Sequence, residues 1–477
     1  MKLAFPLKNN GQINVVAIGG TSQINLLGAE IDTTESTYFG RIDENAYPEF
    51  RTGISAITYE KSLTKKTYAK FTVGASGAKQ LYREDSIALS VPDKPTFLKT
   101  DATFNSVKYS VAGNFSHKFS VASSLYFGVN ADLTVAKIFR KTIRNQAERI
   151  WVNFNENNIL TQGYVTWKYR LGTKFTLNNG MHIQHLSITN QWVAEPRLGV
   201  TFQATGKSSI NLGYGLHHQA QGLYTYYIQK PDGTKTNLDL GFSQSNHFVL
   251  GYNHHVNENL VVKLEGYYQH LDKIPVHRYP SSFSMINEGT NLAPVDQADL
   301  VNKGTGKNYG LDLTLERYLE KGFYYLLTGS LFDSKYTGSD GIERNTAFNT
   351  HHVLNMLAGK EWKLKKEGNT FALNLRLSTT GGRYFTPLDL AASQASKSAV
   401  EDGEKAYSEK QTSYFRLDVK AAYRKEFRKS SLEIALDLQN LTDNKNIFRQ
   451  GYNIANNTIS KEYQQGFFPV PTIRFTF

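Results

Sequence analysis

The first informative feature of this sequence is what it lacks. Its 477 residues include no cysteine, which excludes a disulfide framework and a thiol-ligated zinc site. No stretch approaches 18 consecutive apolar residues, so no segment is long enough to form a transmembrane helix. The hydrolase motif G-x-S-x-G and the zinc-protease motif H-E-x-x-H are also absent. We therefore expect a protein that is not an enzyme and that has no catalytic residues, no metal site and no cofactor.

The composition is rich in two aromatic residues and moderately basic. The chain has 28 Tyr and 28 Phe but only 4 Trp, and its mean hydropathy is −0.44. Tyr and Phe are frequent where a strand meets both lipid and headgroups. The net charge of +12 is spread along the chain, without a run of five or more basic residues. This distribution argues against a nucleic-acid partner, and it is compatible with anionic lipid headgroups.

Apolar residues recur at every second position in many segments, which is the period of a β-strand with one apolar face. The other face carries charged residues or glycine. The strands predicted around these runs span about 9 to 13 residues, the length needed to cross a bilayer at a tilt. The clearest examples are residues 125–133, 210–217, 309–316, 371–378, 415–424 and 432–439.

The connections between the expected strands alternate in length. Short turns are predicted near 8–11, 60–66, 117–121, 177–180, 205–208, 256–259, 319–322, 364–369 and 426–430. Mostly long loops lie between them, near 20–49, 79–104, 134–162, 219–244, 272–305, 382–410 and 441–467. Short turns on one rim and long loops on the other are typical of outer-membrane barrels. The sequence therefore predicts an all-β, transmembrane, antiparallel up-and-down barrel, of which about 18 or 19 strands are present.

The C-terminal region resembles a known family. In residues 432–448 an alternating strand runs into Asn440, Leu441, Thr442, Asp443 and Asn444. This segment is similar to the penultimate-strand pattern of TonB-dependent outer-membrane receptors. The final alternating residues, Ile473, Phe475 and Phe477, look like the last strand of that family, which the barrel-assembly machinery recognises. Weaker matches at 58–77 and 195–215 resemble Bacteroidetes members.

The resemblance implies a bacterial outer-membrane protein in contact with lipid and lipopolysaccharide. Barrels of this family have 22 strands, filled by an N-terminal plug domain that is preceded by a short box that binds TonB. We expect residues 1–477 to be one barrel domain that is truncated at its N-terminus and lacks the plug, the TonB box and a signal peptide. Such a wall lacks several strands, so we expect an open or strained seam between the N-terminal strand and residues 468–477.

Two groups of side chains are candidates for function. The first comprises polar residues on the face opposite the apolar one, which would line the lumen and hold the plug, or merely satisfy one another: Asp312, Glu316, Arg376, Arg416, Asp418 and Lys420. The second comprises three tyrosines in a long loop, which could stack on a ligand or belong to an interfacial aromatic belt: Tyr224, Tyr226 and Tyr227.

Paired histidines occur at 217–218, 254–255 and 351–352, but neighbouring residues of a strand point to opposite faces, so one pair cannot chelate one metal.

We expect the barrel portion of a receptor for active uptake of a scarce solute, such as a siderophore, haem or glycan. A passive channel or an adhesive barrel is the alternative. The sequence does not identify the small-molecule ligand.

Overall fold

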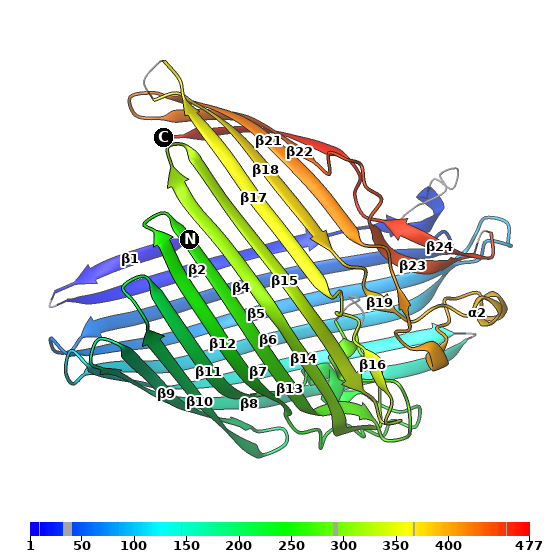
Figure 1. Ribbon diagram of the computed structural model, residues 1–477. Helices are drawn as coiled ribbons and strands as arrows, with labels where there is room; N and C mark the ends of the chain where they lie inside the picture. Colours follow the sequence, from blue (N-terminus) through cyan, green and yellow to red (C-terminus); the bar gives the residue numbers. More distant parts are fainter. Residues whose placement is uncertain (9, 32–40, 145, 290–293, 366–367, 455) are drawn as a thin grey trace.

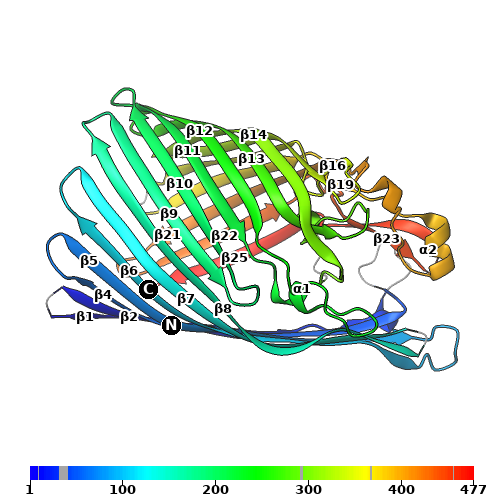
Figure 2. The same cartoon turned by 90° about the horizontal axis from the view of Figure 1, so that it is seen from below.

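In the computed structural model, one antiparallel sheet makes up most of the chain. The structure describes residues 1–477 except 9, 32–40, 145, 290–293, 366–367 and 455, so parts of the loops expected at 20–49 and 272–305 lie outside the described residues. Within the described part, the main sheet has 21 strands, and each long strand pairs with its neighbours in chain order. Figures 1 and 2 show the inclined strands curving into a barrel wall.

The short strands β3 and β16 only extend neighbouring pairs, which leaves nineteen strands in the wall among the described residues. The wall strands are β1 (Lys2–Leu7), β2 (Gly11–Gln23), β4 (Glu44–Ser62), β5 (Thr67–Ile87), β6 (Thr96–Lys118), β7 (Ser123–Arg144), β8 (Ala147–Leu171), β9 (Phe175–Leu186), β10 (Gln191–Gln203), β11 (Ser208–Gln219), β12 (Ser243–Asn257), β13 (Leu260–His277), β14 (Leu300–Glu320), β15 (Phe323–Thr337), β17 (His352–Lys363), β18 (Thr370–Thr380), β21 (Tyr414–Glu426), β22 (Ser431–Gln439) and β25 (Phe468–Thr476).

The remaining elements lie in the connections. They are β3 (Leu26–Leu27), β16 (Glu343–Asn345), β19 (Tyr384–Phe385), β20 (Glu409–Lys410), β23 (Ile447–Asn453), β24 (Thr458–Tyr463), the helices α1 (Leu223–Tyr227) and α2 (Leu390–Ser396), and the 3-10 turns η1 (Gly28–Glu30), η2 (Met285–Asn287) and η3 (Gly403–Lys405). None of the helices in the described part of the chain is long and apolar enough to cross a membrane.

The two faces of the sheet follow the alternation of the sequence. On β14, Leu311 and Leu313 are 57% and 41% exposed, because protein does not cover the outer face. Asp312 between them is half-buried on the inner face. Successive side chains of a strand point to opposite faces, so the apolar residues face outward and the polar residues face the lumen. This arrangement confirms the predicted fold class.

The two ends of the wall differ as expected. At one end the strands are joined by turns of at most six residues, such as 63–66 and 258–259. The helices and the accessory strands gather at the other end (Figures 1 and 2). We call these the tight-turn end and the loop end.

Three expected connections were wrong in detail. Residues 134–162 are not a long loop, because β7 extends to Arg144 and β8 begins at Ala147. The loop expected at 79–104 is likewise shorter, because β5 and β6 are connected only by residues 88–95. In the extensions of β7 and β8 the buried apolar residues, such as Ile138 and Val152, lie on the inner face and pack against the loops. The outward apolar alternation therefore ends although the ladder continues. The turn expected at 177–180 lies at 172–174, where Gly172 has a φ of +61°, a conformation that favours glycine.

The seam of the wall is open. Among the described residues, β1 pairs only with β2, and β25 pairs only with β22. Each edge therefore presents a row of backbone groups that lack ladder partners, which is costly at membrane depth. The expected open seam is confirmed.

Candidate functional site

Three of the polar residues expected in the lumen form one network on the inner face. Arg376 on β18 and Asp418 on β21 are directly opposite in the ladder, and their side chains lie 3.4 Å apart. Arg416 Nε donates to Asp418 Oδ1 at 2.7 Å, and the backbone N–H of Asn440 donates to the same oxygen at 2.8 Å. Lys420, two residues further along β21, lies 3.5 Å from Glu433. These side chains thus satisfy one another.

Asp312 differs from that network. Its Oδ1 is buried and has no hydrogen-bond partner among the described residues. Asp312 is paired in the ladder with Glu265 of β13, and Glu316, four residues along β14, is paired with Val261. A buried carboxylate oxygen without a partner is costly. Of the six polar residues predicted to line the lumen, Asp312 is therefore the one with an oxygen free for a further contact among the described residues.

Two adjoining cavities lie on the inner wall beside Asp312, towards the loop end. The larger has a volume of about 900 Å³ and the smaller about 630 Å³, and they share His247, Gln269 and Ile286. Pockets of several hundred Å³ suit small-molecule ligands. We call these two cavities together the mouth recess. Its wall residues include His217, His247, Tyr267, Gln269, Asp312 and Phe332, and its loop residues include Thr225, Met285, Ile286 and Glu288.

His217 and His247 form the aromatic centre of the mouth recess. Their ring centroids are 4.7 Å apart, because β11 and β12 are paired so that His217 is opposite Ser245 and His247 opposite Gly215. His218 has different neighbours, since it lies beside Glu195 and Phe242. In the part of the chain that the structure describes, no group of three or more His, Asp or Glu side chains could hold a metal ion.

A folded layer of loops lines one side of the mouth recess. It comprises residues 220–242 and the described parts of 278–299, which we call the roof. Wall residues Ile138, Val152 and Phe154 pack with Ile228 of the roof in one buried cluster. A second cluster joins Leu186 of β9 with roof and wall residues including Tyr226, Leu240, Phe242 and Leu300. The roof is thus attached to the wall by apolar packing.

A polar contact adds to this attachment. The Tyr224 hydroxyl donates to Asp296 Oδ1 at 2.7 Å and accepts from Arg140 Nη1 at 2.9 Å. Arg140 also forms an ion pair with Asp296. Burial and the nearby Asp296 carboxylate raise the pKa of Tyr224 above its ordinary value. The hydroxyl therefore stays protonated and able to donate at neutral pH.

The comparisons with known proteins bear directly on this barrel. Residues 7–441 match the family model described as TonB dependent receptor-like, beta-barrel. The chain belongs to this family. It is therefore an outer-membrane receptor barrel of a transporter family rather than an enzyme. No curated protein matches the sequence.

Solved structures share the fold of this TonB-dependent receptor barrel. BauA, the ferric preacinetobactin receptor of Acinetobacter baumannii, is 13% identical with a TM-score of 0.66, over 100% of this chain and 71% of that one. Fiu, the ferric-catecholate import receptor of K12 E. coli, is 10% identical with a TM-score of 0.68, over 99% and 73%. FyuA, the ferric yersiniabactin uptake receptor of Yersinia pestis, is 11% identical with a TM-score of 0.68, over 98% and 68%. Nothing in these comparisons supports the narrower likeness to Bacteroidetes members.

The tyrosines expected to contact a ligand lie in the roof of the receptor barrel. Tyr226 is 0% exposed, and the backbone N–H of Gln221 donates to its hydroxyl. Tyr227 stacks on Phe154 with ring centroids 4.1 Å apart. Tyr226 therefore packs the roof and presents no surface to a ligand in this structure. Ligand contact by Tyr224 and Tyr227 stays a prediction.

The C-terminal residues lie where the alternation predicts. Ile473 is paired with Ile434 of β22 on the outer face and is 76% exposed, and Phe475 is 58% exposed. The terminal Phe477 follows β25 and is 98% exposed. Their recognition by the assembly machinery stays a prediction.

The segment that carried the resemblance forms a turn. Asn440 is 1% exposed and has a φ of +46°. Its side-chain amide donates to the carbonyl oxygens of Asn444 and Gln465, and Asp443 accepts from the backbone N–H of Phe467 at 2.9 Å. Asn and Asp tolerate the left-handed conformation of such turns. The motif thus connects β22 to the long excursion that precedes β25.

Sequence reasoning missed a buried carboxylate near the mouth recess. The side chain of Glu195 on β10 is 2% exposed. It accepts from His182 Nδ1 at 2.7 Å, from Arg197 Nη2 at 2.8 Å and from the backbone N–H of His218 at 2.6 Å. The sequence offers a weak signal, because Glu195 is an inner-face residue flanked by alternating polar residues. Its partners come from three strands, and only the register brings them together.

Proposed function

We propose that this chain is the barrel of a receptor for active uptake of a scarce solute, and that the solute binds in the mouth recess. The observation that carries the proposal is the recess itself, which lies on the lumen side of the wall and is lined by both wall and roof residues. A passive channel needs no such lined recess in its mouth. A ligand held there must be released inward by work, because the outer membrane has no nucleotide supply of its own.

The energy for release would come from TonB, acting through a plug domain in the lumen. Asp312 supports this part of the proposal, because its buried Oδ1 has no partner among the described residues. A donor on a lumen domain would satisfy that oxygen. The network around Asp418 is complete within the wall, so we assign it to holding the strands in register rather than to the plug.

An iron chelate is the first ligand class to test. The recess combines two neighbouring imidazole rings, tilted by 51° to each other, with the apolar Met285 and Ile286 and the amide of Gln269. Such a lining accommodates a ligand with aromatic rings and polar groups. Several receptors with this barrel fold are named as receptors for ferric chelates. Haem and glycans are the alternative ligand classes.

The test is ligand binding by the folded chain in detergent. A panel of a ferric catecholate, a ferric hydroxamate, haem and an oligosaccharide is titrated while intrinsic fluorescence is recorded. We expect one of these ligands to bind, and the double variant His217→Ala/His247→Ala to bind it about tenfold more weakly. His254→Ala is the matched control, since His254 contacts Ser208 near the tight-turn end. Equal binding by both variants would contradict the assignment of the recess.

A further inference from the structure

The wall from β4 to β8 carries a row of basic side chains at the loop end of its apolar outer face. The residues of this row are directly opposite one another in the ladder: Arg51 of β4, Lys79 of β5, Asn105 of β6, Lys137 of β7 and Asn155 of β8. The row thus contains three cations, two amides and no carboxylate. We call it the cationic row.

The cationic row lies on the lipid side of the wall. Lys137 is exposed, whereas its neighbours Ala136 and Ile138 are 0% and 8% exposed. These two neighbours are buried because they pack with roof residues on the inner face. Successive side chains of a strand point to opposite faces. Lys137 therefore points outward, together with the residues that are opposite it in the ladder.

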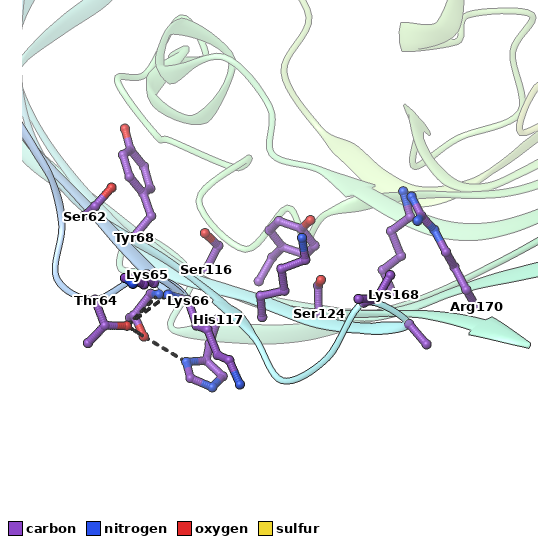
Figure 3. Close-up of a pocket in the computed structure, with 15 residues that line it drawn as sticks. Ser62, Thr64, Lys65, Lys66, Tyr68, Ser116, His117, Ser124, Lys168 and Arg170 are labelled. Atoms are coloured by element: carbon purple, nitrogen blue, oxygen red, sulfur yellow. Dashed lines mark hydrogen bonds between the residues drawn. The ribbon is translucent and has the colours of Figure 1, made fainter.

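The cations at the other end of these strands point to the lumen instead. In Figure 3 the labelled side chains of Lys168 and Arg170 on β8 point to one side of the strands, and His117 on β6 points to the other. His117 differs from Asn105 by an even number of residues, so both lie on the outer face. Lys168 and Arg170 therefore face the space that we assign to a plug domain, and the cationic row does not.

The height of the cationic row in the membrane follows from the strand below it. On β7 the outward residues from Leu125 to Val135 are all apolar, and Val129 among them is 64% exposed. Ten residues of a strand rise about 33 Å, which at a tilt of about 40° spans about 25 Å, the height of the apolar band of an outer-membrane barrel. Lys137 is the next outward residue. The cationic row therefore lies at the level of the lipid headgroups.

The carboxylates of this outer surface lie farther from the membrane. Glu49, which forms an ion pair with Arg51, is nearer the loop end of β4. Asp101 is likewise nearer the loop end of β6, where it is opposite Arg83. Among the described residues, neither Lys79 nor Lys137 forms an ion pair. The side chains closest to the apolar band thus have a net positive charge.

Two of the cations also repel each other. Arg51 and Lys79 are directly opposite in the ladder and lie on the same face. Like charges in that position destabilise a sheet. An anion from outside the protein, bound at this level, would offset the repulsion.

The position of the cationic row identifies the anion. Below the row the outer face is apolar and contacts lipid, as shown by Tyr109 and Val111, which are 51% and 58% exposed. The long loops of such barrels lie outside the cell, so the row meets the headgroups of the outward-facing leaflet. Basic side chains at a membrane surface are attracted to anionic headgroups. The membrane itself brings this anion to the row, whereas a soluble anion would have to be drawn from dilute solution.

We propose that the cationic row binds the phosphate groups of a lipid in the outward-facing leaflet. Lys79 and Lys137 form ion pairs with the phosphates, and the side-chain amide of Asn105 donates a hydrogen bond between them. The acyl chains of the same lipid lie against Val107 and Val135, which are opposite each other directly below the row. This site is separate from the mouth recess, and it does not depend on which solute the recess binds.

The experiment measures lipid binding to the folded chain in nonionic detergent by native mass spectrometry. The probe is diphosphorylated lipid A, and the same lipid with both phosphates removed is the neutral counterpart. Bound lipid is counted for the wild type and for Lys79→Gln/Lys137→Gln. Lys61→Gln/Lys425→Gln is the matched control, because it removes two cations from the outer face at the tight-turn end. A further variant, Lys79→Arg/Lys137→Arg, keeps both charges of the row.

We expect diphosphorylated lipid A to bind the wild type, the control and the Arg variant equally, and to bind Lys79→Gln/Lys137→Gln about tenfold more weakly. The neutral counterpart should not distinguish the four proteins. Undiminished binding by Lys79→Gln/Lys137→Gln would overturn the proposal, and so would an equal loss in the control, since the overall charge of the protein would then explain the binding. Displacement of the lipid by inorganic phosphate at equal phosphate concentration would also overturn it, because the row would then be a site for a free anion.

Discussion

The hydroxyl of Tyr224 donates a hydrogen bond to Asp296 across 72 residues of sequence, at 2.7 Å. Through Arg140 on β7 the same contact ties the roof to the wall. We predict that Tyr224→Phe destabilises the roof by about 1–3 kcal/mol, because a buried hydrogen bond to a charged group is lost. Hydrogen exchange of residues 223–240 should accelerate accordingly.

Tyr279→Phe is the control for this variant, because Tyr279 lies in the other segment of the roof and is 56% exposed. It should leave exchange of residues 223–240 unchanged. Equal exchange in both variants would mean that apolar packing alone holds the roof.

The roof should also respond to pH through Glu288. Burial, together with the carboxylates of Glu401 and Asp296, raises the pKa of Glu288 above its ordinary value of 4.5. The folded roof therefore favours the protonated form. The stabilisation of the roof by protonated Glu288 is complete below the ordinary pKa of a glutamate, and it is lost as the pH rises through the raised pKa of Glu288. We predict that Glu288→Gln slows hydrogen exchange of residues 278–289 at neutral pH more than at about pH 4.5.

Glu258→Gln, at the tight-turn end, is the comparison and should not alter the exchange of residues 278–289 at either pH. If Glu288→Gln changed exchange equally at the two pH values, titration of Glu288 would not be the cause.

The buried Glu195 should matter for stability. Replacing it by Ala leaves His182, Arg197 and the backbone N–H of His218 without their acceptor. Loss of one partner from a buried charged network costs about 3–5 kcal/mol. We predict a clear fall in the temperature at which the folded barrel unfolds, as seen by its mobility in detergent gels. Glu148→Ala, whose exposed ion pair with Lys141 contributes little, should leave that temperature nearly unchanged.

The turn at Gly322 tests the register of the wall. Gly322 has a φ of +75°, and a Cβ there would lie 2.2 Å from the carbonyl oxygen of Glu361. Gly341 has nearly the same φ, +76°, but open space around it. Both Ala variants carry a strain of about 1–2 kcal/mol, and only Gly322→Ala adds the clash. Unfolding free energies should therefore fall further for Gly322→Ala, and equal losses would contradict the packing of this turn against β17.

The sequence predicted the wall because each membrane-crossing strand has one apolar face. Leu311 and Leu313 alternate with Asp312 whatever the neighbouring strands are, so their faces follow from local pattern alone. The extensions of β7 and β8 were missed because their buried apolar residues, such as Val152 and Phe154, lie on the inner face and pack against the loops. The outward apolar pattern that predicted the strands therefore ends before these extensions.

The functional region was less predictable, because it depends on register and on long-range contacts. His217 and His247 meet only because β11 and β12 pair with one particular register. Arg140 and Asp296 are 156 residues apart, and no local pattern links them. The sequence left the roof tyrosines open as ligand contacts or as part of an interfacial aromatic belt, whereas Tyr226 fills an apolar cluster. Composition does not distinguish a packed aromatic residue from an exposed one.

TonB-dependent active uptake is the function that we propose for this barrel, and the sequence of the DNA upstream of the Met1 codon is its sharpest test. We predict an in-frame region that encodes a signal peptide, a TonB-binding segment and a plug domain, followed by the strands that close the seam between β1 and β25. A stop codon directly upstream of a functional start at Met1 would contradict the claim, since neither a plug nor a contact with TonB could then belong to this polypeptide.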